Sequence, residues 1–246
     1  MEKIEKHPFT DLQDSEFQGV QSKLYRVPGH EDMVIRKSFV DVPRDKDDEI
    51  MKGLSEFSAE DAKKMAAHEK AEYLKKKSLE FKKIVDRLGI PMAKTDYVIA
   101  ESTPGTVALF GATERVEGKN LSELSILDER VADMVDDLYS RIISDLIGSY
   151  KSGEYFWCDA KNPQFVFGKV PGDKDSQIYL VDADPDIIHW DSVPMERKEP
   201  LFWNRLTWLV SQMEDMEKKM QGNKGFRFKK AREALEKAKT ESFDVM

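Results

Sequence analysis

The 246-residue sequence has a single cysteine, Cys158, and no long apolar run. One thiol excludes an intramolecular disulfide and a cysteine-rich zinc site, and it is typical of a reducing compartment. The N-terminus lacks the apolar run of a signal peptide, and no segment approaches the roughly 20 apolar residues of a membrane span. The four histidines are scattered without a metal-ligand spacing. We therefore expect a cytoplasmic protein that does not span a membrane.

The sequence also lacks a basic excess, since its formal net charge is −8. Proteins that bind nucleic acids or anionic membranes rely on a positive surface. The charge therefore argues against both partners. Hydrophobic residues make up 40% of the chain, which is enough for one large domain or two lobes with a sizeable core.

The first half of the chain is rich in predicted strands. Residues 23–27 and 33–39 flank a Pro-Gly turn, which is typical of a β-hairpin. Because side chains alternate along a strand, Lys37 shares a face with Ile35, whereas Arg36 lies on the opposite face. Two further strands are predicted at either side of a Thr-Pro-Gly turn, over residues 95–102 and 105–116.

One long helix interrupts these strands. Residues 41–57 are interpreted as a charged insertion, and a capping-box pattern at Ser58 opens a helix that runs to about Leu88. Apolar residues at helical spacing give this helix one buried face near its end, with Glu80 at the edge of that face. Gly89 is predicted to end the helix.

The second half is mainly helical. Residues 117–124 are interpreted as a connector between the halves. Amphipathic helices are predicted over 128–150 and 201–220, with a small hairpin of strands at 165–170 and 177–182 between them. The basic segment 223–239 is interpreted as a solvated helix.

The segment YFWCDAKNPQFVFG, residues 155–168, places a polar cluster between two aromatic walls. The cluster contains Asp159, Lys161, Asn162 and Gln164. Burying such polar groups is costly unless they have partners or a purpose. We predict that the aromatic residues hold a tight loop from which the polar side chains project into a cleft.

The order of these features resembles the protein-kinase-like superfamily, which includes small-molecule kinases of the aminoglycoside-phosphotransferase type. The features are a lysine on an inward strand face, a glutamate on a helix, the break between two halves, the Asp159 cluster, and Asp182 at the end of a strand. The resemblance covers roughly residues 19–184 and rests on spacing and order more than on motif letters.

The resemblance implies a bilobal α+β fold. Residues 1–113 would form a strand-rich N-lobe with one long helix, and residues 114–246 a mainly helical C-lobe. It also implies a phosphotransferase that uses ATP and Mg²⁺ and acts on a hydroxyl group. The acceptor, a small molecule or a protein, is not identified by the sequence.

The same resemblance assigns a nucleotide site. Lys37 would hold the ATP phosphates and Glu80 would position that lysine, with Arg36 as the rival in the neighbouring register. Gly19 is what remains of the glycine-rich loop. Thr113 would stand at the gatekeeper position. After it, the main-chain groups of Glu114 and Val116 would contact the adenine.

The resemblance assigns the catalytic and metal groups to the polar cluster and to Asp182. Asp159 would orient the acceptor hydroxyl and take its proton, while Lys161 would neutralise the transferring phosphoryl group. Gln164 and Asp182 would hold Mg²⁺ through oxygen atoms, with Asn162 as a substitute for Gln164.

Several positions depart from the family pattern. Phe17 and Ser22 stand where the family has glycines, and the arginine of the H-R-D motif is replaced by Cys158. The D-F-G motif is replaced by Asp182-Ala183-Asp184, in which Asp184 would add a metal ligand or cap a turn. The departures leave open a second hypothesis, a pseudokinase that binds nucleotide or serves as a scaffold without turnover. The short remainder of the chain favours a minimal or small-molecule-kinase-like lobe.

Overall fold

The computed structural model describes residues 13–18, 22–27, 29–38, 44–54, 58–103, 106–124, 129–181, 187–219 and 226–241. The chain divides into two compact units. The first contains residues 1–79 and 93–115, and the second contains residues 80–92 and 116–246. The main division therefore follows Arg115, and the segment 80–92 belongs to the second unit.

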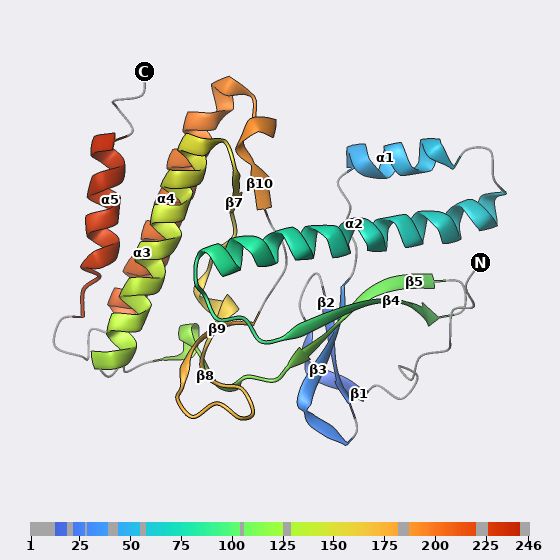
Figure 1. Cartoon of the computed structure of the whole chain (residues 1–246), viewed down its shortest axis with the longest axis horizontal. Helices are drawn as coiled ribbons and strands as arrows, with labels where there is room; N and C mark the ends of the chain where they lie inside the picture. Colours follow the sequence, from blue (N-terminus) through green and yellow to red (C-terminus); the bar gives the residue numbers. More distant parts are fainter. Residues whose placement is uncertain are drawn as a thin grey trace. The chain divides into compact units, whose positions relative to one another are not determined.

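The first unit contains a five-stranded antiparallel sheet with the order β1-β2-β3-β5-β4 (Figure 1). Its strands are β1 (Gln13–Gln18), β2 (Ser22–Val27), β3 (His30–Ser38), β4 (Thr95–Thr103) and β5 (Thr106–Glu114). The predicted hairpin is thus confirmed, and Gly29 in its turn has φ +79°, a conformation that glycine adopts without strain. Strand β1 was not predicted.

Strand register confirms the predicted face of Lys37. Lys37 pairs with Phe110 across the sheet, and Ile35 pairs with Ala112. Phe110 and Ile35 are buried in one apolar cluster with Ala100 and Ala108. Because directly paired residues share a face of the sheet, Lys37 lies on the apolar face, and Arg36 lies on the other.

The first unit also contains helical residues that the sequence only partly indicates. The segment interpreted as an insertion contains helix α1 (Arg44–Gly53), whose Ile50 packs with Leu54 against Ala62 and Ala66. These alanines belong to α2 (Ala59–Arg87), the predicted long helix. Gly89 has φ +61°, and the N–H of Ile90 donates to the carbonyl of Val85 at 3.2 Å, so the helix ends as expected.

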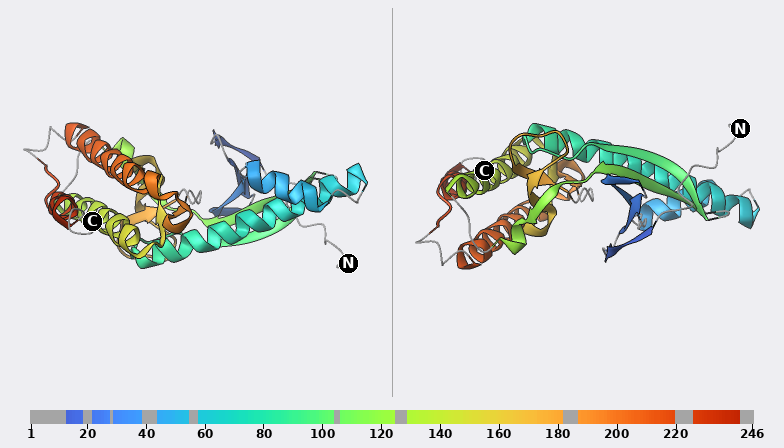
Figure 2. Two further views of the ribbon diagram at one scale, coloured as in Figure 1. Left: turned by 90° about the horizontal axis from the view of Figure 1, so that it is seen from above. Right: turned by 90° about the horizontal axis from the view of Figure 1, so that it is seen from below.

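Besides the end of α2, the described part of the second unit contains three long helices. These are α3 (Glu129–Ser152), α4 (Met195–Lys219) and α5 (Lys230–Glu241), and α3 packs against both of the others (Figures 1 and 2). Helix α4 begins six residues before the predicted Leu201 and includes Pro200 near its start, a residue that the sequence suggested as a helix boundary. A proline there removes one hydrogen bond, the one to the carbonyl of the exposed Glu196.

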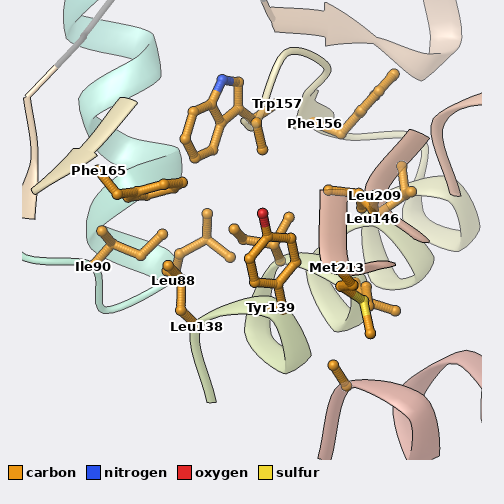
Figure 3. Packing of buried hydrophobic residues seen from close by; sticks show 14 of the residues in the cluster. Leu88, Ile90, Leu138, Tyr139, Leu146, Phe156, Trp157, Phe165, Leu209 and Met213 are labelled. Carbon is orange, nitrogen blue, oxygen red and sulfur yellow. The ribbon is translucent and has the colours of Figure 1, made fainter. Parts of the chain in front are cut away.

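Apolar residues from the end of α2, from α3 and from α4 form one core in this unit (Figure 3). The packed side chains include Leu88, Leu138, Tyr139, Leu146, Phe156, Trp157, Phe165, Leu209 and Met213. The helical periodicity in the sequence therefore indicated the correct inward faces of α3 and α4.

Two small sheets complete the second unit. One has the order β6-β8-β9, with β6 (Glu117–Asn120), β8 (Phe165–Lys169) and β9 (Gln177–Leu180), and the other pairs β7 (Tyr155–Trp157) with β10 (Ile187–His189). The predicted connector is thus a strand followed by a short 3₁₀ helix, η2 (Leu121–Glu123). Gly118 and Gly168 are paired, and a Cβ on either would lie 2.2 Å from a backbone oxygen, so this pairing requires glycine at both positions.

The α+β class with a strand-rich and a mainly helical unit is confirmed. Within the described ranges, none of the helices is sufficiently long and apolar to traverse a bilayer.

Candidate functional site

The polar cluster lies on a loop between β7 and β8 that is closed by its own hydrogen bonds. Asn162–Gln164 form a single 3₁₀ turn, η3, with Pro163 in its first turn. The N–H of Gln164 donates to the carbonyl of Lys161 at 3.0 Å, and the N–H of Lys161 donates to Oε1 of Gln164 at 2.9 Å. The N–H of Val181 donates to the carbonyl of Gln164 at 2.9 Å. The loop is therefore fastened to the end of β9.

The loop brings Asp159 and Lys161 together. Nζ of Lys161 lies 2.7 Å from Oδ2 of Asp159, and the two side chains are 38% and 32% exposed, respectively. Nε2 of Gln164 lies 3.5 Å from the same oxygen. Three of the predicted site residues thus meet at one carboxylate that solvent reaches.

Asn162, by contrast, points into the protein. It is 5% exposed, its Oδ1 accepts from the Tyr139 hydroxyl at 2.6 Å, and its Nδ2 donates to the carbonyl of Gln212 at 3.2 Å. Burial raises the pKa of Tyr139 far above its ordinary value, so this hydroxyl keeps its proton and acts as the donor. Asn162 therefore connects the loop to α3 and α4.

Aromatic contacts hold the residues that precede the loop. The ring of Trp157 meets Phe81 and Phe165 edge to face at centroid distances of 5.2 and 5.7 Å. Phe156 stacks on Trp190 at 4.3 Å with an interplanar angle of 16°. Such contacts contribute about 0.5–1.5 kcal/mol each beyond burial, so the aromatic wall restricts the loop.

A further residue, Asn120, holds the loop from the end of β6. Its Nδ2 donates to the carbonyl of Pro163 at 2.5 Å, while its Oδ1 accepts from the N–H of Ser122 at 2.8 Å. Sequence reasoning missed Asn120, as it missed Tyr139 and the residues of α4 that contact the loop. The local signal at Asn120 was its position before an apolar residue that starts a helical turn, a pattern typical of a cap.

The predicted nucleotide residues are distributed over both units. Lys37 is half-buried on β3 of the first unit, where Glu114 ends β5 and its N–H donates to the carbonyl of Lys94 at 3.0 Å. Glu80 on α2 and Val116 are half-buried residues of the second unit. Thr113 shares a hydrogen bond with Thr95, at 3.0 Å between their hydroxyl oxygens.

Gly19, Asp182 and Asp184 lie outside the described residues. In the described ranges, there is no group of three or more acidic, histidine or cysteine side chains arranged to hold a metal. Gln164 uses its amide oxygen for the N–H of Lys161, and a second lone pair on that oxygen suits a hard cation. Asn162 is less suited, because its amide oxygen already accepts from the buried hydroxyl of Tyr139.

Fold and site together define an α+β protein of two units that carries an exposed aspartate–lysine pair on a tightly bonded loop. No protein-family model and no curated protein matches the sequence. Among solved structures, the chain is similar to APH(2")-IIia in its complex with GDP and kanamycin. The match covers 96% of this chain and 94% of that chain, with 10% sequence identity and a TM-score of 0.37. A similarity this low says nothing about function, which has to be inferred from the residues of the loop.

Proposed function

We propose that the chain is a kinase-like phosphotransferase that transfers the γ-phosphoryl group of ATP to a hydroxyl group of an acceptor. The observation that carries this proposal is the solvent-reached pair of Asp159 and Lys161, 2.7 Å apart on a loop with internal and external hydrogen bonds. Phosphoryl transfer needs mainly positioned groups and neutralised charge, and the loop offers both.

Asp159 would act on the acceptor. Within the described residues, both side-chain contacts of Asp159 are made by Oδ2, so Oδ1 is the oxygen that would accept the hydroxyl proton. The acceptor oxygen would form its bond to phosphorus as the bond from phosphorus to the leaving ADP oxygen breaks. Lys161 would donate to the transferring group while Asp159 keeps the ammonium in place.

The remaining residues would bind the nucleotide. Lys37, positioned by Glu80, would meet the phosphates, Gly19 would approach them, and main-chain groups of Glu114 and Val116 would meet the adenine. Mg²⁺ would be held by Gln164 and Asp182, and its charge would offset that of the phosphates. The acceptor class is not assigned.

A pseudokinase is the second candidate. It is favoured by the replacement of two loop glycines by Phe17 and Ser22, and by the pairing of the Asp159 carboxylate with Lys161 in the protein itself. It predicts nucleotide binding that is weak or independent of Mg²⁺, or a scaffold role, and in either case no turnover.

The first experiment is a thermal-shift titration with ATP, with and without Mg²⁺, on the wild type and on Asp182→Asn. A ligand that binds only the folded state raises the melting temperature. We expect an increase that depends on Mg²⁺ and is lost in Asp182→Asn. No shift with any nucleotide would refute the phosphotransferase and leave a pseudokinase that serves as a scaffold.

The second experiment separates the two candidates. Transfer from γ-labelled ATP to water, to the protein itself and to a panel of hydroxyl acceptors is measured for the wild type and Asp159→Asn. Turnover that Asp159→Asn loses while it still binds ATP supports the phosphotransferase. Binding without turnover in both proteins supports the pseudokinase.

A further inference from the structure

One face of α4 contacts the loop at three successive points. Arg205, Trp208 and Gln212 are spaced by three and four residues, so they lie on the same side of the helix. Nη1 of Arg205 donates to the carbonyl of Cys158 at 3.1 Å, and Nε1 of Trp208 donates to the carbonyl of Ala160 at 3.2 Å. The carbonyl of Gln212 accepts from Nδ2 of Asn162 at 3.2 Å.

These three contacts alternate with the two charged residues. The contacts are made at residues 158, 160 and 162, and the residues between them are Asp159 and Lys161. Lys161 has the extended conformation, with φ −144° and ψ 152°. The contacts of α4 therefore hold the loop immediately before and after each of the two charged residues, whose side chains meet at 2.7 Å.

We propose that Arg205, Trp208 and Gln212 form a positioning stripe that sets the geometry of the Asp159–Lys161 pair. The stripe does not touch the reacting atoms; it acts on the loop that carries them, through two backbone carbonyls and the side chain of Asn162. Its effect on catalysis rests on the proposed function, whereas its effect on the loop does not.

Trp208 is the most informative member. Its side chain is 38% exposed, so the indole is not a fully buried core residue, and its N–H reaches the carbonyl adjacent to Asp159. Trp208→Phe removes this donor and keeps an aromatic ring. Trp203→Phe is a matched control, because Nε1 of Trp203 on the same helix donates to the side chain of Glu199 at 3.4 Å and not to the loop. Arg205→Met is a second test variant that keeps the apolar stem of the side chain.

Cys158 supplies a readout that is independent of activity. It is the single cysteine of the chain, it is 3% exposed, and its own carbonyl is the acceptor of Arg205. The rate at which a thiol reagent modifies Cys158 under native conditions therefore reports opening of the loop. Losing one hydrogen bond is expected to increase that rate on the order of two- to tenfold.

The experiment measures Cys158 modification, the denaturant midpoint, and kcat and KM for ATP in the four proteins. We expect Trp208→Phe and Arg205→Met to be modified faster, with a smaller change in the denaturant midpoint, and Trp203→Phe to match the wild type. In an active wild type, we expect kcat to fall about tenfold or more in the two test variants with little change in KM, because misplaced groups slow the chemical step.

Two results would refute the proposed positioning role of the stripe. One is modification of Cys158 at the wild-type rate in both test variants. The other is faster modification that is fully explained by an equal loss of global stability, which would assign the stripe a structural role only. An inactive wild type would refute the phosphotransferase and leave the Cys158 result to decide on the stripe.

Discussion

Carboxylates in two regions of the second unit are held in different ways. Asp136 on α3 is 6% exposed, and it accepts from the N–H groups of Lys229, Lys230 and Ala231, at the start of α5, at 2.9–3.0 Å. In the loop between β7 and β8, Asp159 is partly exposed, with 32% of its side chain reached by solvent, and it meets Lys161 and Gln164 through one oxygen.

Glu217 at the end of α4 resembles Asp136. Its side chain is 4% exposed, its Oε2 accepts from Arg227 and Arg232 at 2.8 and 2.9 Å, and its Oε1 accepts from the N–H of Phe228 at 3.0 Å. Asp136 and Glu217 together fasten α5 and the residues before it to α3 and α4. Their charges are satisfied within the protein, as buried charges must be.

The contacts of these carboxylates indicate that Asp159 is the one available for chemistry. Asp136 and Glu217 use both oxygens for internal partners, so replacing them should change stability. Asp159 uses one oxygen and keeps solvent access, so replacing it should change function and leave stability nearly intact. Substitutions in the two regions therefore test whether Asp159 serves function while Asp136 and Glu217 serve stability.

The largest expected effect is that of Asp159→Asn on phosphoryl transfer. Loss of a positioned general base typically lowers the rate by a factor on the order of 1000, equivalent to about 4 kcal/mol of barrier. The free energy of unfolding should change by less than about 1 kcal/mol, because a pair this exposed contributes little to stability. Single-turnover kinetics and urea denaturation measure the two quantities. A large loss of stability with unchanged transfer would reverse the roles assigned to the two regions.

Asp136→Ala should have the largest effect on stability. Three backbone N–H groups at the start of α5 would lose their acceptor, and hydrogen bonds to a charged group are the stronger ones, so we expect a loss of about 3 kcal/mol. Urea denaturation measures this loss. Asp133→Ala is the control on the same helix, since Asp133 is 68% exposed and pairs only with Lys230 among the described residues. Equal effects of the two substitutions would contradict the role of burial.

Glu217→Gln should make stability depend less on pH. Burial raises the pKa of Glu217, but hydrogen bonds from Arg232, the N–H of Phe228 and Arg227 lower it by more, so its pKa lies below the ordinary value. A lowered pKa in the folded state means that ionised Glu217 stabilises the protein above pH about 4.3, and that this contribution is lost as the pH falls through the folded-state pKa.

The measurement is the difference in the free energy of unfolding between wild type and Glu217→Gln. We expect about 2 kcal/mol at pH 7, the contribution of hydrogen bonds to a buried carboxylate, and a smaller difference near pH 3. Glu214→Gln, at an exposed position on the same helix, is the control. A difference that is constant over this pH range would show that the charge of Glu217 is not what stabilises the contact.

The sequence predicted those parts of the fold that depend on local periodicity. The predicted helices over 58–88 and 128–150 correspond to α2 at Ala59–Arg87 and α3 at Glu129–Ser152, because apolar spacing along the chain determines which face is buried. Helix α1 was missed because its segment is highly charged and its apolar contacts are with another helix. Strand β6 was missed because Glu117–Asn120 contains no apolar side chain and pairs with a strand far along the chain.

The candidate site likewise contains features that depend on local sequence and features that depend on distant contacts. The closeness of Asp159, Lys161 and Gln164 follows from six consecutive residues and was predicted, whereas the partners of the loop were not. Asn162 was weighed as a metal ligand because its side chain has the right oxygen, and only the packing of α3 and α4 reveals that this oxygen accepts from Tyr139. Contacts between segments that are distant in sequence cannot be predicted from the residue pattern of either segment alone.

The smallest expected effect is the change in the free energy of unfolding when the hydrogen bond between Tyr139 and Asn162 is removed. Tyr139→Phe removes the hydroxyl that donates to Asn162 at 2.6 Å and keeps the ring that packs edge to face on Phe228 at 5.3 Å. A buried amide oxygen that loses its donor should reduce the free energy of unfolding by about 1 kcal/mol.

Tyr150→Phe on the same helix removes a hydroxyl that makes no hydrogen bond to the described residues, so its effect should be smaller. Urea denaturation and the rate of Cys158 modification are measured on both variants. If Tyr139 anchors the loop, its variant alone will be modified faster, because Asn162 lies on the same loop as Cys158. If the two variants behave alike, the hydroxyl of Tyr139 does not restrain the loop, and the loop that carries Asp159 is held by its own hydrogen bonds and by its contacts with α4, β6 and the end of β9.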